Sequence, residues 1–404
     1  MEYYKLSNIA AGVFLFLLVL MPAGSFLGIN FKILTLLLFL GALVFDGRSE
    51  VIVSAIKKIF LPAVLLLIFI VYAVIANDQG ILYLYQAKDI IIFFVVYAIL
   101  SSYFYDNEKR DKAFKIIISA LVFSAFIKIA MLAYSQVTGH PIVLLVKSYG
   151  QLFGMSLMTY AIDGSSLGRI QFLSDFIIPL ALFYMLKDFG AGRFRKRDYI
   201  YFVAICFSVF IGMSRFYWAI SALFIFLGVL FNVKGKGILS ISILVVLVVG
   251  AASLNESVQN SLEARFSAQK STASDNIRTQ QLELFSKRIE QSPILGKGLG
   301  YFVPEYQQEG DMKYNYELQV PALAMQIGYL GVFALLLVLL IPFAMMLKKS
   351  TFRALIVASI AFWSWFLSGF FNPVLFSSAG GVCYVACLFL MALMCKENER
   401  VILH

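Results

Sequence analysis

The sequence predicts an all-α polytopic membrane protein, and three observations lead to that prediction. Of its 404 residues, 61% are hydrophobic and only 14% are charged, whereas a soluble domain is about half apolar and about a quarter charged. The mean hydropathy is +0.86. The apolar residues form continuous runs of helical length and not the alternating pattern of barrel strands. We therefore expect a single transmembrane domain that covers residues 1–404.

The apolar runs predict about twelve spanning helices. They cover residues 8–28, 31–45, 59–76, 81–104, 116–136, 168–186, 199–213, 216–232, 237–253, 318–346, 354–371 and 375–395. The first run follows Lys5 as the apolar part of a signal peptide would. It lacks a convincing small-residue cleavage site, and a second apolar run follows at once, so we expect it to be retained as a span.

The charge of the connections predicts the topology. The basic connections are 46–58, 106–115, 187–198, 233–236, 347–353 and the tail from Lys396, and they alternate with connections at 77–80, 137–167, 212–216, 254–318 and 371–375. Basic connections belong in the cytoplasm by the positive-inside rule. Both termini are then cytoplasmic, and 137–167 and 254–318 form two long outer segments. The first of these contains LFGMSLM (152–158), which we expect to be half-buried or to lie on the surface.

The outer segment 254–318 is the one long polar stretch of the chain, between the ninth and tenth predicted spans. We expect it to cap a cavity in the membrane. An amphipathic helix is predicted over 277–291, with Asp275 or Asn276 as its N-cap and Pro293 just beyond its end. Its predicted apolar stripe consists of Leu282, Phe285 and Ile289.

Composition argues against several other classes of protein. The net charge of +10 follows from membrane orientation and does not require a nucleic-acid partner. The four cysteines lie within or at the end of apolar runs, so neither a disulfide framework nor a zinc site is indicated. The two histidines, His140 and His404, offer no metal cluster. We expect no cofactor.

Five arginines at the predicted outer face are candidates for anion binding. They are Arg169, Arg215, Arg265, Arg278 and Arg288. Arg215 lies in a turn between two apolar helices, where an arginine is costly unless it meets an anion or a cavity. Several guanidinium groups around one cavity suit a diphosphate, because each binds phosphate oxygens bidentately and stabilises charge on a departing phosphate without a metal.

Each arginine also has an ordinary interpretation. Arg215 can snorkel to the lipid headgroups. Arg169 can form a local ion pair with Asp175, and Arg278 can lie on a solvated helix face. The solvated interpretation is the stronger one for Arg265 and Arg288.

Glu317 opens the tenth predicted span, with Pro321 in the first turn, where proline is tolerated. A helix N-terminus favours an ionised carboxylate, and partial burial disfavours it. A carboxylate balanced in this way can take a proton from a sugar hydroxyl. The alternative is a simple acid at a helix start.

Three further features have no settled role. GKGLG (296–300) does not follow a strand and lacks the Ser or Thr of a P-loop, so we expect a tight loop and not a nucleotide cradle. Lys88 and Asp89 are candidates for a buried pair, and Lys128 lies within a span. Four outer-loop tyrosines are candidates for stacking on sugars: Tyr301, Tyr306, Tyr314 and Tyr316.

Three patterns, in this order and with this topology, resemble the O-antigen ligase / Wzy-type O-antigen polymerase superfamily. SRFYW (214–218) is similar to the family's Ser-Arg element at the outer end of a helix. Arg278 followed by QSPILGKGLGYF (291–302) is similar to its Arg, helix, then Pro-x-x-Gly-x-Gly-x-Gly pattern. YELQVPALAMQIGYLG (316–331) is similar to the segment that starts the next long helix. The resemblance extends over the whole chain, and its specific motifs fall within 214–331.

The resemblance implies a GT-C-like helical fold and roles for particular residues. It implies that Arg215 and Arg278 bind a pyrophosphate, with Arg169 and Arg265 as weaker candidates. The ligases usually have His-Asn where this chain has Glu317 and Leu318. That departure favours a polymerase over a ligase.

We therefore expect an inverting, metal-independent glycosyltransferase of the bacterial inner membrane whose site faces the periplasm. The expected donor is a growing glycan on undecaprenyl pyrophosphate, and the acceptor is a lipid-linked repeat unit. The resemblance also implies a chain-length regulator (a polysaccharide co-polymerase) as partner. Two alternatives stay open: a ligase that moves glycan onto lipid A core, and a polysaccharide transporter or flippase.

Overall fold

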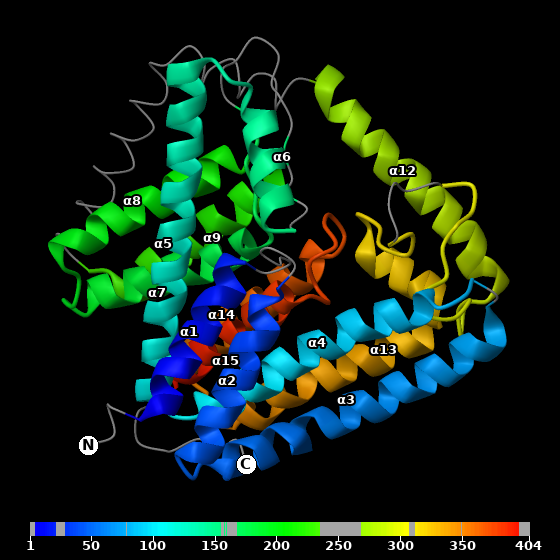
Figure 1. Ribbon diagram of the computed structural model, residues 1–404, viewed down its shortest axis with the longest axis horizontal. Helices are drawn as coiled ribbons and strands as arrows, with labels where there is room; N and C mark the ends of the chain where they lie inside the picture. The colour runs from blue at the N-terminus through cyan, green and yellow to red at the C-terminus, as the bar shows by residue number, and fades with distance from the viewer. Residues whose placement is uncertain are drawn as a thin grey trace. The chain divides into compact units, whose positions relative to one another are not determined.

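The computed structural model of this protein is built from helices (Figure 1). It describes residues 5–21, 29–77, 79–154, 157, 159, 168–234, 268–306, 312–348 and 350–395, with only the backbone described for 268–275. Every regular element in these ranges is an α- or 3-10 helix. The predicted all-α class is therefore confirmed.

Within the described ranges, five helices are long and apolar enough to cross a membrane. They are α3 (Ser49–Ala76), α4 (Leu82–Tyr103), α5 (Asn107–Thr138), α9 (Arg215–Asn232) and α13 (Gln319–Leu347). Shorter apolar helices are α1 (Leu6–Leu20), α2 (Phe31–Phe45), α6 (Ile142–Leu152), α14 (Phe352–Ser368) and α15 (Ser378–Met394). Large apolar side chains such as Phe60 and Ile75 of α3 are 69% and 79% exposed, as is typical of helices that face lipid. The chain is a helical membrane protein by these criteria.

The number of spans and their orientation stay predictions, and the ninth predicted run, 237–253, lies outside the described residues. Two helices begin earlier than predicted. α3 begins at Ser49 and not at 59, and α5 begins at Asn107 and not at 116. Both early turns lack the glycine or proline that would end a helix, so the helices continue into the basic connections.

The polar helix α12 (Ala268–Gln291) also begins earlier than expected. Asp275 and Asn276 lie inside it, so their prediction as N-cap residues was wrong. The residues before them contain no glycine or proline, and the helix therefore passes through both polar side chains. Of the predicted surface piece 152–158, Leu152 ends α6, and residues 155, 156 and 158 lie outside the described residues.

The chain divides into two compact units. Unit 1 consists of Met1–Phe39 and Asp111–Thr272, and unit 2 of Leu40–Arg110 and Ala273–His404. Three helices, α2, α5 and α12, have residues in both units.

Unit 1 is organised around the close packing of α7 (Ile178–Gly190) and α9. A methyl group on Gly228 of α9 would lie 2.7 Å from Leu186 Cδ1. Glycine therefore permits this approach, because any larger residue would push the helices apart. The 3-10 helix η2 (Leu173–Ile177) leads into α7, and α8 (Lys196–Ile211) packs on both α7 and α9.

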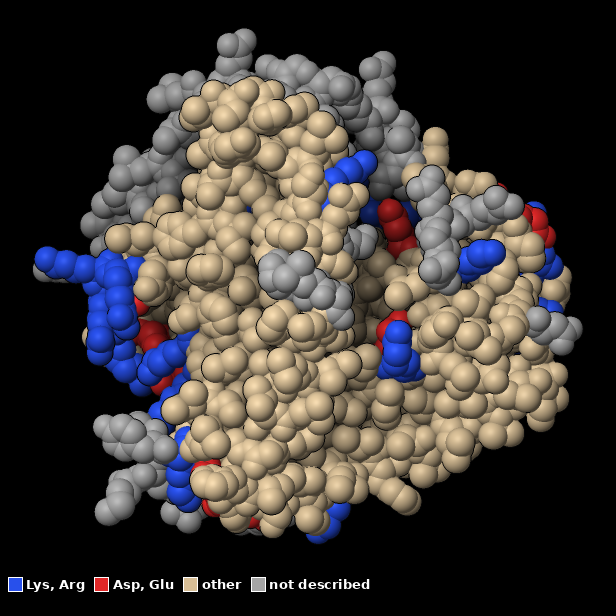
Figure 2. Space-filling view, in the orientation of Figure 1, with Lys and Arg blue, Asp and Glu red and all other residues tan. Residues whose placement is uncertain are grey.

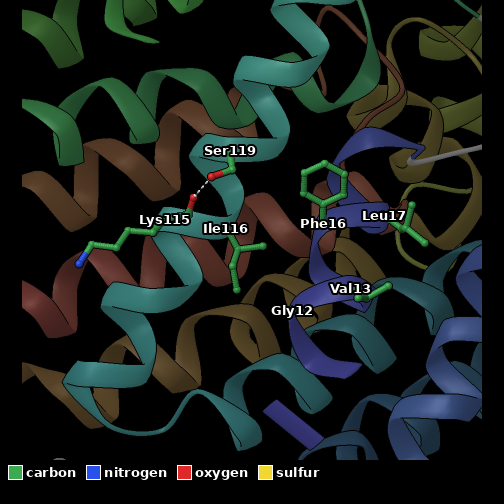
Figure 3. Close-up of a pocket in the computed structure, with 7 residues that line it drawn as sticks. All are labelled: Gly12, Val13, Phe16, Leu17, Lys115, Ile116 and Ser119. Carbon is green, nitrogen blue, oxygen red and sulfur yellow. Dashed lines mark hydrogen bonds between the residues drawn. The ribbon is translucent and has the colours of Figure 1, made fainter. Parts of the chain in front are cut away.

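Unit 1 also has an apolar groove of about 440 Å³ between α1 and α5 (Figure 3). Gly12 and Ile116 both line it, and a Cβ at position 12 would lie 3.6 Å from Ile116 Cδ1. Lys115 reaches away from the groove (Figure 3) and its amine lies 2.5 Å from Asp111 Oδ2. The groove therefore offers methyl groups and little polarity.

Basic side chains on the viewed face gather where α7 and α8 meet, while most of that face is uncharged (Figures 1 and 2). The exposed basic residues of this connection are Arg193, Arg195, Lys196 and Arg197. Their charges lie at the helix ends and not along the helices.

Unit 2 is built on α3, α4 and α13, which run side by side, with α15 packed against α4 and α14 (Figure 1). The Phe93 ring of α4 is the centre of its aromatic core. That ring stacks on Trp365 at a centroid distance of 5.7 Å and meets Phe376 at 5.4 Å. These contacts fix the connection between α14 and α15, which borders the candidate site.

Candidate functional site

The inward face of α12 differs from the predicted apolar stripe. Phe285 is fully buried and Ile289 packs on the same core, as predicted. Leu282 is instead 50% exposed, and Gln281 is fully buried in its place. Positions 281 and 285 are one turn apart, so Arg278, three residues before Gln281, lies on the same inward face.

Arg278 meets Glu317 on this face. The distance from Arg278 Nε to Glu317 Oε2 is 3.4 Å, and the two side chains are 27% and 45% exposed. The Arg278 guanidinium carbon also lies 5.6 Å from the centroid of the Phe371 ring. The structure thus brings together two residues that were predicted for one site, and adds Phe371.

The Glu317 carboxylate is paired but still open to a further hydrogen bond. Its Oε2 atom is enclosed, and it accepts no hydrogen bond from any residue that the structure describes. An ion pair this exposed is worth at most about 1 kcal/mol. A bound anion can therefore displace Glu317 from Arg278 at little cost, which leaves the carboxylate oxygens for a proton donor.

Three hydrogen bonds anchor the backbone around Glu317. Glu317 was predicted to open this helix, but it lies two residues before Gln319, the first residue of α13. The Leu318 amide donates to Gln281 Oε1 at 3.3 Å. The Val320 amide donates to the Gly369 carbonyl at 3.0 Å, and Gln319 Oε1 accepts from the Leu375 amide at 2.8 Å. These bonds tie the start of α13 to α12 and to the connection between α14 and α15.

The glycine-rich segment 296–300 is a tight loop, as expected. Gly296, Gly298 and Gly300 have φ values of +74°, +94° and +75°, which only glycine adopts at little cost. The amides of Lys297 and Gly298 donate to carbonyls of α13 at 2.9 and 2.7 Å. They are therefore used within the protein and do not form a phosphate cradle.

α13 is broken where this loop docks. Gly328 has φ 68° and ψ 174°, far from helical values. The amides of Tyr329 and Leu330, which the break releases, donate to the carbonyls of Pro293 and Ile294 at 2.9 and 3.2 Å. The kink thus has an identifiable cause, because the loop replaces the lost helical hydrogen bonds.

Two buried glutamines, which sequence reasoning missed, lock the loop in place. Gln86 Nε2 donates to Gln326 Oε1 at 2.6 Å, and Gln86 Oε1 accepts from the Gly300 amide at 2.6 Å. Gln326 Nε2 donates to the carbonyls of Tyr301 and Tyr314. A glutamine within an apolar run was the only signal for either residue.

Tyr314 and Tyr316 do not stack on a ligand here, because they are only 5% and 1% exposed. Tyr314 donates to Asp89 Oδ2 at 2.8 Å, and burial, followed by the Asp89 charge, raises the pKa of Tyr314. Asp89 is therefore bound to the loop and does not form a buried pair with Lys88, which is exposed. Tyr301 and Tyr306 are partly exposed and remain candidates for sugar contacts.

The other predicted arginines lie elsewhere. Arg288 pairs with Glu305 on an exposed face, as its solvated interpretation predicted. Arg265 lies outside the described residues. Arg215 is the exposed first residue of α9, directly after the short connection 212–214.

Arg169 donates to Gln171 Oε1, and its charge also acts on the Asp175 carboxylate. That carboxylate forms its ion pair with the ammonium group of Lys128. Arg169 and Arg215 belong to unit 1, whereas Arg278 and Glu317 belong to unit 2. The described part of the chain has no group of three or more His, Cys, Asp or Glu side chains placed to hold a metal ion.

Comparisons with protein-family models, with curated proteins and with solved structures find no match to this chain.

Proposed function

We propose that this chain is a polysaccharide polymerase of the O-antigen type in the bacterial inner membrane. It transfers a growing glycan from undecaprenyl pyrophosphate to the terminal sugar hydroxyl of a lipid-linked repeat unit, at the periplasmic face. The observation that carries the proposal is the contact of 3.4 Å between Arg278 and Glu317. The motif resemblance over 214–331 and the apolar helices, which give access from lipid, support it.

In this proposal Arg278 binds the donor pyrophosphate. A guanidinium forms two parallel hydrogen bonds with phosphate oxygens, which both positions the donor and stabilises the leaving group. The weak pairing with Glu317 favours this exchange of partners, since the phosphate offers Arg278 more charge than one carboxylate does. Arg215, Arg169 and Arg265 are proposed as further pyrophosphate ligands on the motif resemblance alone.

Glu317 acts as the general base. The acceptor hydroxyl oxygen forms a bond to the anomeric carbon of the donor, and its proton passes to Glu317. The bond between that carbon and the pyrophosphate oxygen breaks with both electrons staying on the oxygen, and the configuration inverts. General base catalysis contributes about 10²- to 10⁴-fold to a rate. A chain-length regulator in the same membrane is the proposed protein partner.

The test compares two Arg–Glu pairs that join α12 to the segment after it. Purified variants Glu317→Gln and Arg278→Lys are incubated with lipid-linked repeat units taken from cells that lack the chain. Polymer formation is expected to fall by about 100-fold or more. The matched controls Glu305→Gln and Arg288→Lys alter the exposed second pair and should keep wild-type rates.

Three outcomes contradict the proposal. Equal losses in both pairs would show that the effect is not specific to Glu317 and Arg278. Product formed only with a lipid A core acceptor would identify a ligase. Loss of repeat-unit translocation across the membrane in Glu317→Gln would identify a transporter.

A further inference from the structure

Basic side chains gather in unit 2 around the end of α4. Arg48 Nη1 donates to the hydroxyl of Tyr103 at 3.4 Å, and the Lys109 amine lies 5.5 Å from the centroid of the same ring. Lys58 Nζ donates to Ser101 Oγ at 3.1 Å, two residues earlier on α4. These residues come from the connections 46–58 and 106–115, which the charge pattern assigns to the cytoplasmic side.

Arg110 is the buried member of this cluster. Its side chain is 2% exposed, and its Nη1 donates to Asn107 Oδ1 at 3.0 Å. Its Nε and Nη2 atoms are enclosed and donate to no residue that the structure describes. Buried donors in proteins are nearly always satisfied, and a charged one left without an acceptor is costly. The positive charge of Arg110 is therefore incompletely compensated within the described residues and attracts an anion bound nearby.

The charges around Arg110 do not balance. Arg110 lies close enough to Lys58 for the two cations to repel each other. Asp106 is the acid that acts on Arg110, but its carboxylate also pairs with Lys109 at 3.5 Å. Asp106 is thus shared between two cations, and Lys58 adds a third positive charge next to Arg110, so a further negative group is attracted to this cluster.

An apolar cavity of about 210 Å³ lies beside the cluster, in the same unit. Lys57 and Lys58 line one part of it, and the remaining wall is largely apolar. The apolar lining includes Leu61, Pro62, Phe94, Val338, Ile341 and Pro342. Amines beside methyl and ring surfaces match a molecule with an anionic head and a hydrocarbon tail.

We propose that this site binds an anionic phospholipid. The phosphate accepts hydrogen bonds from Lys57 and Lys58 and is attracted by the positive charge of Arg110. An acyl chain of the same lipid occupies the cavity between α3, α4 and α13. Basic pockets between membrane helices on the cytoplasmic side suit such headgroups, because anionic lipids are abundant there. The site is independent of the proposed glycan transfer and uses none of its residues.

The test uses the full-length protein in detergent and native mass spectrometry with phosphatidylglycerol, phosphatidylcholine or inorganic phosphate. Wild-type protein should retain phosphatidylglycerol in preference to phosphatidylcholine. In Lys57→Gln/Lys58→Gln the affinity for phosphatidylglycerol should fall by about 30-fold, since each cation near a lipid surface contributes about a factor of five. The matched control Arg195→Gln/Arg197→Gln removes two exposed charges from the connection of α7 and α8 and should keep the preference.

Val338→Trp, which fills the cavity and keeps every charge, should also weaken phosphatidylglycerol binding.

The proposal is overturned if wild-type protein, which needs no variant to fold, binds the two lipids equally. It is also overturned if the control loses as much affinity as the lysine variant, because the effect would then reflect net charge. Displacement of phosphatidylglycerol by inorganic phosphate at equal concentration would identify a site for a free anion instead. Unchanged binding in Val338→Trp would exclude the cavity as the acyl-chain site.

Discussion

Lys128 and Asp175 form an ion pair that is closed to solvent. Lys128 Nζ lies 2.5 Å from Asp175 Oδ2, and neither side chain is exposed. Lys128 also donates to Ser208 Oγ at 2.9 Å, and Asp175 Oδ2 accepts from the Phe172 amide at 2.8 Å. The pair therefore joins α5, η2 and α8 within unit 1, and it fixes the turn that follows Arg169.

Lys128→Met is expected to lower the free energy of unfolding by about 3–5 kcal/mol, because it leaves the Asp175 carboxylate buried without a cation. The double variant Lys128→Met/Asp175→Leu should recover much of that loss, since both desolvated charges are then gone. Denaturant unfolding of the detergent-solubilised protein measures both values.

The control for this prediction lies on the same helix. Lys115 also pairs with an aspartate at 2.5 Å, but its side chain is 61% exposed. Lys115→Met should therefore cost less than about 1 kcal/mol. Similar losses for Lys115→Met and Lys128→Met would refute the idea that burial decides the cost.

Gly300→Ala is expected to undock the glycine loop. A Cβ at this position would lie 2.2 Å from the Tyr83 amide nitrogen, in backbone that cannot give way. Gly192 has a similar φ of +70° but nothing within 4 Å of its Cβ position. Gly192→Ala should cost about 1–2 kcal/mol for the left-handed backbone alone, and Gly300→Ala about 1–3 kcal/mol more for the clash. Thermal unfolding and limited proteolysis of the two variants measure the difference, and equal stability would argue against a docked loop.

Tyr316 should make stability sensitive to alkaline pH. Burial raises the pKa of Tyr316 to about 12, against about 10 for an exposed tyrosine. The unfolded chain therefore loses this proton first. The raised pKa of Tyr316 therefore contributes fully to the free energy of unfolding below a pH of about 10, and this contribution is lost as the pH rises towards about 12.

Tyr316→Phe isolates this contribution. At neutral pH it should cost about 1–3 kcal/mol, because the buried Val303 amide, which donates to the Tyr316 hydroxyl at 2.8 Å, loses its acceptor. The difference in unfolding free energy between wild type and Tyr316→Phe should shrink over the alkaline interval. A difference that stays constant with pH would contradict the assigned pKa.

The sequence predicted the helices more reliably than their ends. α2 matched its predicted range, because Asn30 before it and Gly47 after it mark its limits. α12 began earlier than predicted, because a helix interior tolerates an aspartate such as Asp275 and no glycine or proline stands between Ala268 and that residue to end the helix. For the site, sequence reasoning selected Arg278 and Glu317 but missed Phe371, Gln281 and Gln326. Those residues carry no charge that would mark them in an apolar or polar run.

The sequence alone determined that the chain is a helical membrane protein. Long apolar runs can be read directly from the sequence, and in lipid such a run must be helical because its backbone has to satisfy its own hydrogen bonds. It also identified the connecting segments that carry the polar and charged candidate site residues. The tertiary structure decided which polar groups meet. Asp175 binds Lys128, 47 residues away, and Gln86 binds Gln326, 240 residues away. The physical reason is that hydrophobic patterning acts over a few turns of one helix, whereas a buried ion pair or amide contact depends on how distant helices pack.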